Sequence, residues 1–294
     1  MRSTDVLKEA LPYIRRFSGA RFVVKLSGEA VDDPLQLVPL AEEIALLHYV
    51  GMKVLVVHGG GAQATELSKA LGIEPRIVQG RRVTDEKTLD VAKMVFAGKI
   101  NVEILSALRR AGARAVGLSG VDGDILHARR RPPTRIVDHI LGTEEEVDFG
   151  FVGDVEDVDA SLLEYLLDGG YIPVLSSLGA DKEGTIFNIN ADTVATEIAI
   201  AIRAAKIIYL TNVRGVLVKR GGMPELVTEL TPSEARELIV QGEVTGGMIP
   251  KLENAIRAVE RGVGRSHIIS GDEEDSLLKE IFTKGGTGTM VALR

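Results

Sequence analysis

Two lysines stand at positions where a charge is costly. Lys25 lies within FVVKL, residues 22–26, a run of β-branched and aromatic residues that predicts a buried strand. Lys251 follows Pro250, which the sequence predicts at the first position of a helix, and a cation in the first turn opposes the helix dipole by roughly 0.3–1 kcal/mol. A bound anion would offset both costs. The alternative for each is an ammonium group that reaches solvent along its apolar stem.

Three consecutive glycines lie between a predicted strand and a predicted helix in VVHGGGAQATEL, residues 56–67. Glycines allow the backbone to approach a ligand closely, and free N–H groups at a helix N-terminus attract anions. A simple tight turn would also explain them. Neither the P-loop pattern nor the dinucleotide-binding glycine fingerprint occurs in the chain, so those two interpretations of the glycines are excluded.

Directed polar groups cluster in two further segments. FNINADTVATEIA places Asn188, Asn190 and Asp192 at alternate positions before a predicted helix, where N-capping explains one of them but not all three. QGRRVTDE places Arg81 and Arg82 before Thr84, which we interpret as a helix cap. An arginine can hold a carboxylate through two parallel hydrogen bonds, although one of this pair is expected to be exposed.

Together these residues describe a polyanion site without a paired nucleophile and base. Transfer of a phosphoryl group to a carboxylate fits, because a carboxylate is already an ionised nucleophile. The obstacle is repulsion between two anions, which positioned cations and N–H groups relieve. Lys25 would then reach from the end of its strand towards the transferring group.

Strand-like and helical segments alternate along the chain and would position this site. Apolar runs at 22–26, 53–58, 114–119, 171–177, 206–211 and 266–270 predict strands of a mostly parallel open sheet sandwiched between helices, an α/β fold with αβα layers. Helices are expected at about 4–16 and 34–49, through Leu89 and Phe96, and through Ala195 and Ile202. Residues 124–155 break the alternation and predict an antiparallel hairpin flap. Within it, the charges of Arg129–Arg131 and Glu144–Glu146 suggest an irregular, solvated insertion.

Composition excludes several classes of protein. A chain of 294 residues with 45% hydrophobic content can bury a large core, and a net charge of −7 argues against nucleic acid or an anionic membrane as partner. There is no cysteine, and five scattered histidines do not suggest a metal site. No apolar run approaches the length of a membrane span, so a cytoplasmic location is expected.

An ordered set of motifs over nearly the whole chain resembles the amino acid kinase family, and within it the arginine-sensitive N-acetylglutamate kinases. The motifs are KLSG, VVHGGG, GRRVTDE, AVGLSGVDGD, FGFVGDVE, NINADTVA, LTNVRGVL, GGMIPKLE and GTGTMV. The resemblance implies transfer of the γ-phosphoryl group of ATP, with Mg²⁺, to N-acetyl-L-glutamate in arginine biosynthesis. It also implies a lobe at 19–183 for substrate and dimerisation, and a lobe at 184–294 for ATP.

The resemblance also implies roles for individual residues. Lys25 and Lys251 would stabilise the transition state and Asp192 would orient them. The substrate would be held by Gly60, Gly61, Arg82, Asn188 and Asn190, and the nucleotide by Gly28, Thr211, Asn212, Gly247 and Met248. No residue is expected to hold a metal on its own.

The segment VLKEALPYIRRF resembles the additional N-terminal helix of the arginine-inhibited members. By this resemblance residues 1–18 would join dimers into a hexamer, a trimer of dimers, and Tyr13, His267 and Glu280 would bind arginine as an inhibitor. Taken singly, each of these three residues has an ordinary structural explanation. A nitrogen-signalling protein is a further candidate partner.

Two positions depart from the pattern of the family, and three alternatives stay open. Ser27 stands where a second glycine is usual, and Asn212 stands where an aspartate is usual. The first alternative is a kinase of the same fold that acts on an aminoadipate derivative. The second is a kinase that acts on UMP, since KLSGEA also resembles the start of bacterial uridylate kinases. The third is an arginine-sensing protein without turnover.

Overall fold

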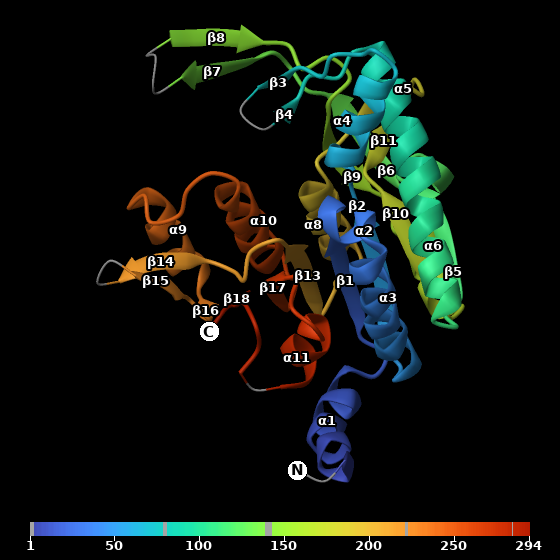
Figure 1. The fold of residues 1–294 in the computed structure, drawn as a ribbon, viewed down its shortest axis with the longest axis vertical. Helices are drawn as coiled ribbons and strands as arrows, with labels where there is room; N and C mark the ends of the chain where they lie inside the picture. Colours follow the sequence, from blue (N-terminus) through green and yellow to red (C-terminus); the bar gives the residue numbers. More distant parts are fainter. Residues whose placement is uncertain (1–2, 79–80, 139–142, 221–222, 284) are drawn as a thin grey trace.

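An open, mostly parallel sheet forms the centre of the protein (Figure 1). The computed structural model describes residues 3–78, 81–138, 143–220, 223–283 and 285–294. Within these residues the sheet has eight strands, and all neighbours are parallel except β17 and β18. Across the sheet the order is β16 (Glu229–Leu230), β18 (Thr289–Val291), β17 (Arg265–Ser270), β13 (Lys206–Thr211), β1 (Arg21–Leu26), β2 (Lys53–His58), β10 (Ile172–Ser176) and β5 (Ala115–Ser119). The predicted fold class is confirmed.

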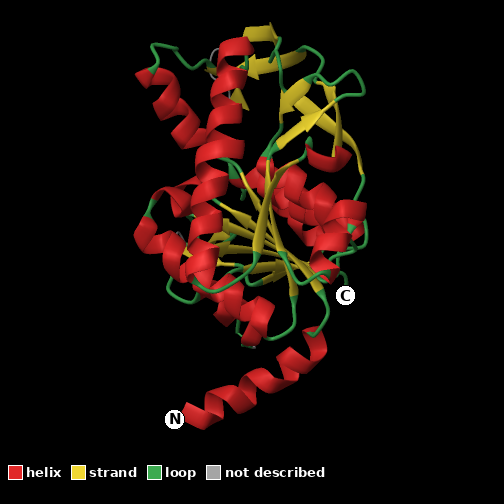
Figure 2. Cartoon of the chain, turned by 90° about the vertical axis from the view of Figure 1, so that its right-hand side faces the viewer, coloured by secondary structure: helices red, strands yellow, loops and turns green. Residues whose placement is uncertain are grey.

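Helices cover both faces of this sheet, as Figure 2 shows. Successive side chains of a strand point to opposite faces, so Phe22 and Val24 of β1 join one buried cluster while Val23 joins the other. The first face is covered by α3 (Pro34–Tyr49), α6 (Asn101–Arg110) and α11 (Ser276–Phe282), and the second by α7 (Ser161–Asp168), α8 (Ala191–Ala201) and α10 (Met248–Glu260). This double cover explains why the strands read as continuous apolar runs.

The predicted helix through Leu89 and Phe96 is present but changes its winding. It begins as α5 (Glu86–Lys93), continues as a π-helix, η1 (Met94–Ile100), and resumes as α6. Its N-cap is Asp85, whose side chain accepts a hydrogen bond from Thr88 N at 2.8 Å. The prediction of Thr84 as the cap is therefore wrong, because Thr84 is fully buried and pairs with the loop around Gly150.

Antiparallel strand pairs are present within residues 126–138 and 143–158. β6 (Leu126–Arg130) pairs with β9 (Gly153–Val158) in a small sheet with β11 (Leu178–Ala180) and β12 (Ile186–Asn188), and β7 (Thr134–Asp138) pairs with β8 (Thr143–Val147) as a hairpin. The predicted hairpin is confirmed.

The interpretation of the charged residues in this segment as irregular is wrong. Arg129 and Arg130 belong to β6 and Glu144–Glu146 belong to β8, while residues 139–142 lie outside the described chain. Opposite charges face one another across the strands: Arg135 is in register with Glu146, and Arg130 lies 2.8 Å from Asp148. Such pairs make charged strands compatible with a sheet.

Further short elements complete the chain. They are α2 (Gly28–Asp32), α4 (Gly61–Ala70), α9 (Pro232–Val240), the 3₁₀ turn η2 (Asp122–Asp124), the pair β3 (Ile77–Val78) and β4 (Arg81–Arg82), and the hairpin β14 (Leu217–Arg220) and β15 (Met223–Leu226). No helix among the described residues has the length and apolar character that crossing a membrane requires.

The N-terminal helix α1 (Ser3–Phe17) projects from one end of the molecule (Figures 1 and 2). The sequence predicts it at about 4–16, so its extent agrees closely. Phe17 at its end packs edge-on against Phe22 of β1, with ring centroids 5.3 Å apart. The helix is thus fixed to the core at its C-terminal end.

Candidate functional site

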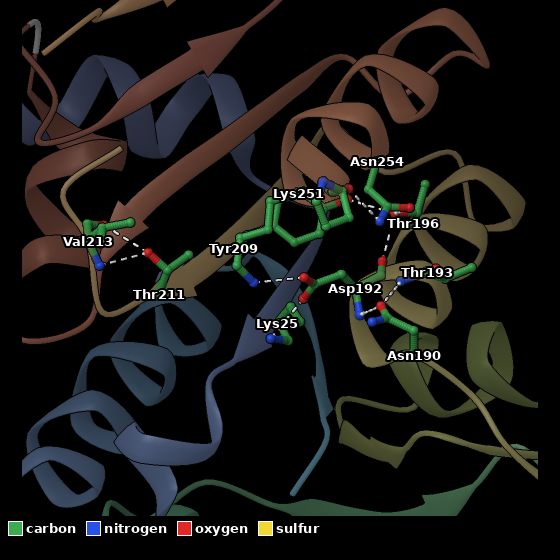
Figure 3. Close-up of polar contacts among 11 residues, drawn as sticks. Lys25, Asn190, Asp192, Thr193, Thr196, Tyr209, Thr211, Val213, Lys251 and Asn254 are labelled. Atoms are coloured by element: carbon green, nitrogen blue, oxygen red, sulfur yellow. Dashed lines mark hydrogen bonds and ion pairs between the residues drawn. The ribbon is translucent and has the colours of Figure 1, made fainter. Parts of the chain in front are cut away.

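Asp192 lies between Lys25 and Lys251, the two lysines that the sequence analysis identifies (Figure 3). Lys25 Nζ is 2.7 Å from its Oδ1, and Lys251 Nζ is 2.7 Å from its Oδ2. The three residues come from β1, α8 and α10, because Lys25 sits near the carboxyl end of the central strand and both helices begin beside it. The predicted convergence of the two ammonium groups is therefore present in the fold.

Burial makes this cluster strongly coupled. Lys25 is 9% exposed and Asp192 is 7% exposed. Burial alone would disfavour the charge of Asp192, but the attraction of Lys25 and Lys251 outweighs it and lowers the pKa of this carboxyl group to about 2. Two cations thus share one anion, and the cluster keeps a net positive charge for a further anion.

The backbone of α8 begins where Asn190 caps it. Asn190 Oδ1 accepts hydrogen bonds from Asp192 N at 2.9 Å and Thr193 N at 3.1 Å. This fixes the first turn of the helix and with it the carboxylate of Asp192. The oxygen of Asn190 is therefore occupied, and its amide NH₂ group is left for any ligand.

A buried polar network beneath the lysines was not predicted from the sequence. Thr196 Oγ1 lies 2.7 Å from Asp192 O, 2.7 Å from the hydroxyl of Tyr209 and 3.2 Å from Asn254 Oδ1. Burial raises the pKa of Tyr209, so its hydroxyl stays protonated. The network joins α8, β13 and α10, and a tyrosine that interrupts the apolar run KIIYLT was its only signal.

The helix that carries Lys251 starts earlier than expected. It begins at Met248 with Gly247 as N-cap residue, so Pro250 is its third residue and not its first. Lys251 remains in the first turn, as predicted, which begins with Met248, and Gly247 directly precedes the helix. The N–H groups of Met248 and Ile249 bond to Thr245 O and Gly246 O, so the start of this helix contributes its dipole and no unpaired donor from these two residues.

The glycine loop joins His58 of β2 to α4, and Gly60 is its crowded position. A Cβ added at Gly60 would lie 2.3 Å from Ile100 Cδ1 and 2.8 Å from Phe96 Cδ1, whereas at Gly61 it would meet nothing within 4 Å. Only glycine fits at residue 60. Within the described chain, no hydrogen bond from the N–H groups of Gly60 or Gly61 is found, so both can donate to a ligand.

Arg82 lies against this loop. Its Nη2 donates to Gly61 O at 2.7 Å and to Thr65 Oγ1 at 2.5 Å, while its buried Nη1 has no partner among the described residues. Burial lowers the pKa of Arg82 from its usual value. Arg81 is exposed, which agrees with the expectation that one arginine of the pair faces solvent.

Asn188 ends β12 and is the third member of the polar segment. Its Nδ2 donates to Thr84 Oγ1 at 3.2 Å, and its backbone bridges to Val152. Thr84 is two residues from Arg82 in the sequence, so this hydrogen bond ties Asn188 to the segment that carries the arginine.

Ser27 has a structural use at the start of α2. Its hydroxyl accepts a hydrogen bond from Ala30 N at 3.2 Å, and Gly28 follows as the first helical residue. Gln63 Nε2 donates to Gly28 O at 2.7 Å and ties this turn to the glycine loop. The sequence did not suggest this role for Gln63.

Thr211 is the last residue of β13, and Asn212 follows it. Thr211 is buried and its hydroxyl bonds to both polar backbone groups of Val213, at 2.8 and 3.0 Å, while Asn212 is exposed. The closed turn places Asn212 at the carboxyl edge of the sheet, where ligands of open α/β sheets bind.

Tyr13, His267 and Glu280 lie apart from the lysine pair and line one cavity of about 320 Å³. His267 Nδ1 is 2.5 Å from Glu280 Oε1, and Glu280 Oε2 accepts a hydrogen bond from Thr287 N at 2.6 Å. Burial opposes the charge of Glu280, but its hydrogen bond with His267 lowers the pKa of the carboxyl group to about 2. The fold therefore brings all three predicted residues together around an ionised carboxylate.

Two other features set limits on the chemistry. A larger cavity of about 410 Å³ lies between β14, β16 and α9, and neither Lys25, Asp192 nor Lys251 lines it. Among the described residues, no group of three or more His, Cys, Asp or Glu side chains is arranged to hold a metal ion.

Comparison with known proteins identifies the family. The model of the amino acid kinase family matches residues 20–270. The acetylglutamate kinase of Methanocorpusculum labreanum is 49% identical over 98% of this chain and 96% of its own length. That of Methanoregula boonei is 48% identical over the full length of both chains.

Solved structures share the fold. N-acetylglutamate synthase from Neisseria gonorrhoeae, complexed with coenzyme A and N-acetyl-glutamate, superposes with a TM-score of 0.85 at 30% identity, and this chain spans 64% of its length. Carbamate kinase from Giardia lamblia superposes with a TM-score of 0.66 at 18% identity, over 94% of this chain and 99% of that one. The chain therefore belongs to the amino acid kinase family and, within it, to the acetylglutamate kinases.

Proposed function

We propose that this enzyme transfers the γ-phosphoryl group of ATP to the γ-carboxylate of N-acetyl-L-glutamate, the second step of arginine biosynthesis. The observation that carries the proposal is the convergence of Lys25 and Lys251 on Asp192, next to free backbone N–H groups. The names of the full-length relatives support the substrate.

The reaction needs electrostatics more than acid or base catalysis. A carboxylate oxygen of the substrate forms the new bond to phosphorus, and the oxygen that bridges to the β-phosphate leaves with the electron pair as part of ADP. Both reactants are anions, so Lys25 and Lys251 would neutralise charge on the transferring group while Asp192 holds both ammonium groups in place. The N–H groups of Gly60 and Gly61 would donate to its oxygens.

Arg82, Asn188 and Asn190 would hold the substrate. The buried Nη1 of Arg82, which has no partner in the described chain, can donate to a carboxylate. Asn190 can donate through its amide NH₂ group, because its oxygen already caps α8. Asn188 can donate through the amide hydrogen that does not bond Thr84. These contacts give directed recognition of a small acylated amino acid.

Gly28, Thr211, Asn212, Gly247 and Met248 would contact the nucleotide. Gly28 and Met248 begin helices, and Gly247 precedes one. Thr211 ends β13 and Asn212 follows it, at the carboxyl edge of the sheet near Lys25 and Lys251. Bound magnesium would supply charge neutralisation on the phosphate chain. Asn212 adds no charge of its own there.

The two halves of the sheet would serve the two substrates. We assign residues 19–183 to the acetylglutamate lobe and residues 184–294 to the ATP lobe. In support, β1, β2, β5 and β10 form one side of the central sheet, and β13, β16, β17 and β18 form the other. Lys25 and Lys251 belong to opposite lobes in this division.

Arginine would act as a feedback inhibitor in the cavity lined by Tyr13, His267 and Glu280. The ionised carboxylate of Glu280 suits a guanidinium group. A related structure supports the choice of ligand, since gonococcal N-acetylglutamate synthase was solved with coenzyme A and L-arginine and is 28% identical with a TM-score of 0.80.

The projecting helix α1 would link dimers into a hexamer in the cytoplasm, where a nitrogen-signalling protein is a candidate partner. Its length and its attachment at Phe17 support a role in assembly. Deleting residues 1–16 should convert a hexamer into dimers in analytical ultracentrifugation. A truncated protein that sediments as a hexamer would show that α1 is not needed for assembly of the hexamer.

The proposed reaction is tested by trapping the product. The purified enzyme is incubated with MgATP and hydroxylamine, and N-acetyl-L-glutamate, an aminoadipate derivative or UMP is supplied in turn. Acyl phosphate should form with N-acetyl-L-glutamate, at a kcat/KM well above that of the aminoadipate derivative, and ADP should not be released with UMP. Arginine binding without turnover on any of the three would identify a sensor in place of a kinase.

A further inference from the structure

His58 is a completely buried histidine directly before the glycine loop. It ends β2, is 0% exposed and touches no residue of the lysine pair by hydrogen bond. Its Nδ1 lies 2.9 Å from Gly59 O, and its Nε2 lies 3.2 Å from Asn101 Nδ2. The ring thus connects the loop to α6.

These two contacts fix the tautomer of the ring. A carbonyl oxygen only accepts, so Nδ1 carries the proton and donates it to Gly59 O. Nε2 then has a free lone pair, which accepts a hydrogen bond from the amide of Asn101. Burial lowers the pKa of His58 to about 4, so the imidazole is neutral near pH 7.

Asn101 is itself held firmly. Its Nδ2 lies 3.0 Å from Val174 O of β10 and 3.3 Å from Leu118 O of β5. A Cβ at Gly117 would lie only 2.0 Å from Asn101 Oδ1, so the amide packs directly on bare backbone. Asn101 therefore links the imidazole to β5 and β10 of the central sheet.

The π-helix η1 and the residue after it contact both the glycine loop and His58. Phe96 and Ile100 of η1 fill the space beside Gly60, and Asn101, the next residue, bonds His58. A π-helix changes the angular spacing of side chains, and such insertions often accompany functional sites. Here Phe96 and Ile100 contact the loop, and Asn101 contacts the histidine that precedes it.

Because the peptide bond is planar, the contact of His58 with the Gly59 carbonyl also sets the direction of the Gly60 N–H. The Gly59 carbonyl and the Gly60 N–H belong to one trans peptide unit and point in opposite directions. When Nδ1 of His58 fixes the carbonyl, it also directs the Gly60 N–H away from the ring. That N–H has no partner among the described residues.

We propose that His58 is a positioning residue of the kinase: anchored by Asn101, it orients the Gly59–Gly60 peptide so that the Gly60 N–H donates to the transferring phosphoryl group. The inference rests on the proposed function, because it assigns that N–H to the phosphoryl oxygen. It adds a residue that contacts neither substrate.

The test compares two substitutions of His58. His58→Leu removes the donor to Gly59 O, whereas His58→Asn keeps an N–H close to the position of Nδ1. His58→Leu should lower kcat roughly 10- to 100-fold, below the 100- to 1000-fold of a donor removed outright. KM for both substrates should change less than about threefold, since the interaction strengthens in the transition state. His58→Asn should stay within about fivefold of the wild-type kcat.

Ile104→Val is the control for a general loss of stability. Ile104 is buried on the same helix as Asn101, and its shortening should leave kcat unchanged. A His58→Leu enzyme with wild-type kcat would overturn the inference. So would a His58→Asn enzyme as impaired as His58→Leu.

A second measurement does not depend on turnover. In crystal structures the Gly59–Gly60 peptide should be rotated in His58→Leu and retained in His58→Asn. An unrotated peptide in His58→Leu overturns the positioning role even if the wild-type enzyme proves inactive on N-acetyl-L-glutamate. Inactivity of the wild type together with a rotated peptide in His58→Leu would overturn only the proposed function.

Discussion

Lys25 and Lys251 bind the two different oxygens of one buried carboxylate, that of Asp192, each at 2.7 Å. Neither ammonium group neutralises the other lysine's charge, so the cluster carries one positive charge more than its anion. A buried excess charge costs free energy unless something repays it. We propose that the phosphoryl group in transfer provides that compensation.

The glycine loop offers a test of steric fit. Gly60→Ala should destabilise the enzyme by about 1–3 kcal/mol, because its Cβ would collide with Ile100 Cδ1 and the ring of Phe96. Ile100→Val, which removes that Cδ1 atom, should recover part of the loss. Thermal unfolding of the single and double variants measures both effects.

Gly61→Ala is the matched control for this substitution. A Cβ there meets no atom within 4 Å, and residue 61 is the first of α4, where alanine is a good helix former. Its stability should equal or exceed that of the wild type. Equal losses at positions 60 and 61 would contradict the proposed packing.

Glu43 predicts a pH dependence of stability. Its Oε2 accepts hydrogen bonds from Leu277 N at 3.0 Å and Leu278 N at 3.1 Å, which joins α3 to α11. Burial raises the pKa of Glu43 to about 7, and the hydrogen bond from Leu278 counteracts only part of this effect. For a raised pKa, the stabilisation is complete below the ordinary value of 4.5 and is lost as pH rises through 7.

The free energy of unfolding of the wild type should thus fall by on the order of 3 kcal/mol between about pH 4.5 and pH 8 from this group alone. Glu43→Gln should remove that part of the slope, while Glu42→Gln at the exposed neighbouring position should keep it. Urea unfolding at a series of pH values measures the difference. Identical slopes in wild type and Glu43→Gln would disprove the assignment.

The proposed arginine site, the cavity lined by Tyr13, His267 and Glu280, can be tested separately from catalysis. Glu280→Gln and Tyr13→Phe should each raise the arginine concentration for half-inhibition, the former by at least about tenfold, since a charged hydrogen bond contributes roughly 1.5–3 kcal/mol. kcat without arginine should stay close to that of the wild type, because the cavity does not include the lysine pair. Tyr165→Phe, at an exposed tyrosine on α7, is the control. Unaltered inhibition of Glu280→Gln would exclude this cavity.

The sequence predicts the central sheet well because its strands are buried on both faces and read as unbroken runs of Val, Ile and Leu, as in β2. It also predicts the lysine pair, since a lysine in such a run demands a partner. The sequence predicts antiparallel strands within 124–155, and the pairing of β6 with β9 agrees with this. It does not predict β7 and β8, because their charges are typical of a solvated loop and the pairing of Arg135 with Glu146 depends on register.

Other features depend on contacts between distant segments. The π-helix leaves no signal in hydrophobic periodicity, since Val95, Phe96 and Ile100 suit an ordinary helix equally well. Asp85 and Thr84 are both good caps, and only the burial of Thr84 decides between them. The hydrogen bond between His58 and Asn101 joins residues whose proximity is set by the sheet.

The most direct test of the central claim is single-turnover transfer from ATP to N-acetyl-L-glutamate by Lys25→Met and Lys251→Met, with Lys53→Met as control. Lys53 is also a strand lysine paired with an aspartate, at 2.6 Å from Asp168, but the pair is partly exposed on the surface. The two site variants should each lose roughly 100- to 1000-fold in rate, by analogy with a lost oxyanion donor, and Lys53→Met should lose less than about twofold. A rate within about threefold of the wild type for either site variant would contradict the account.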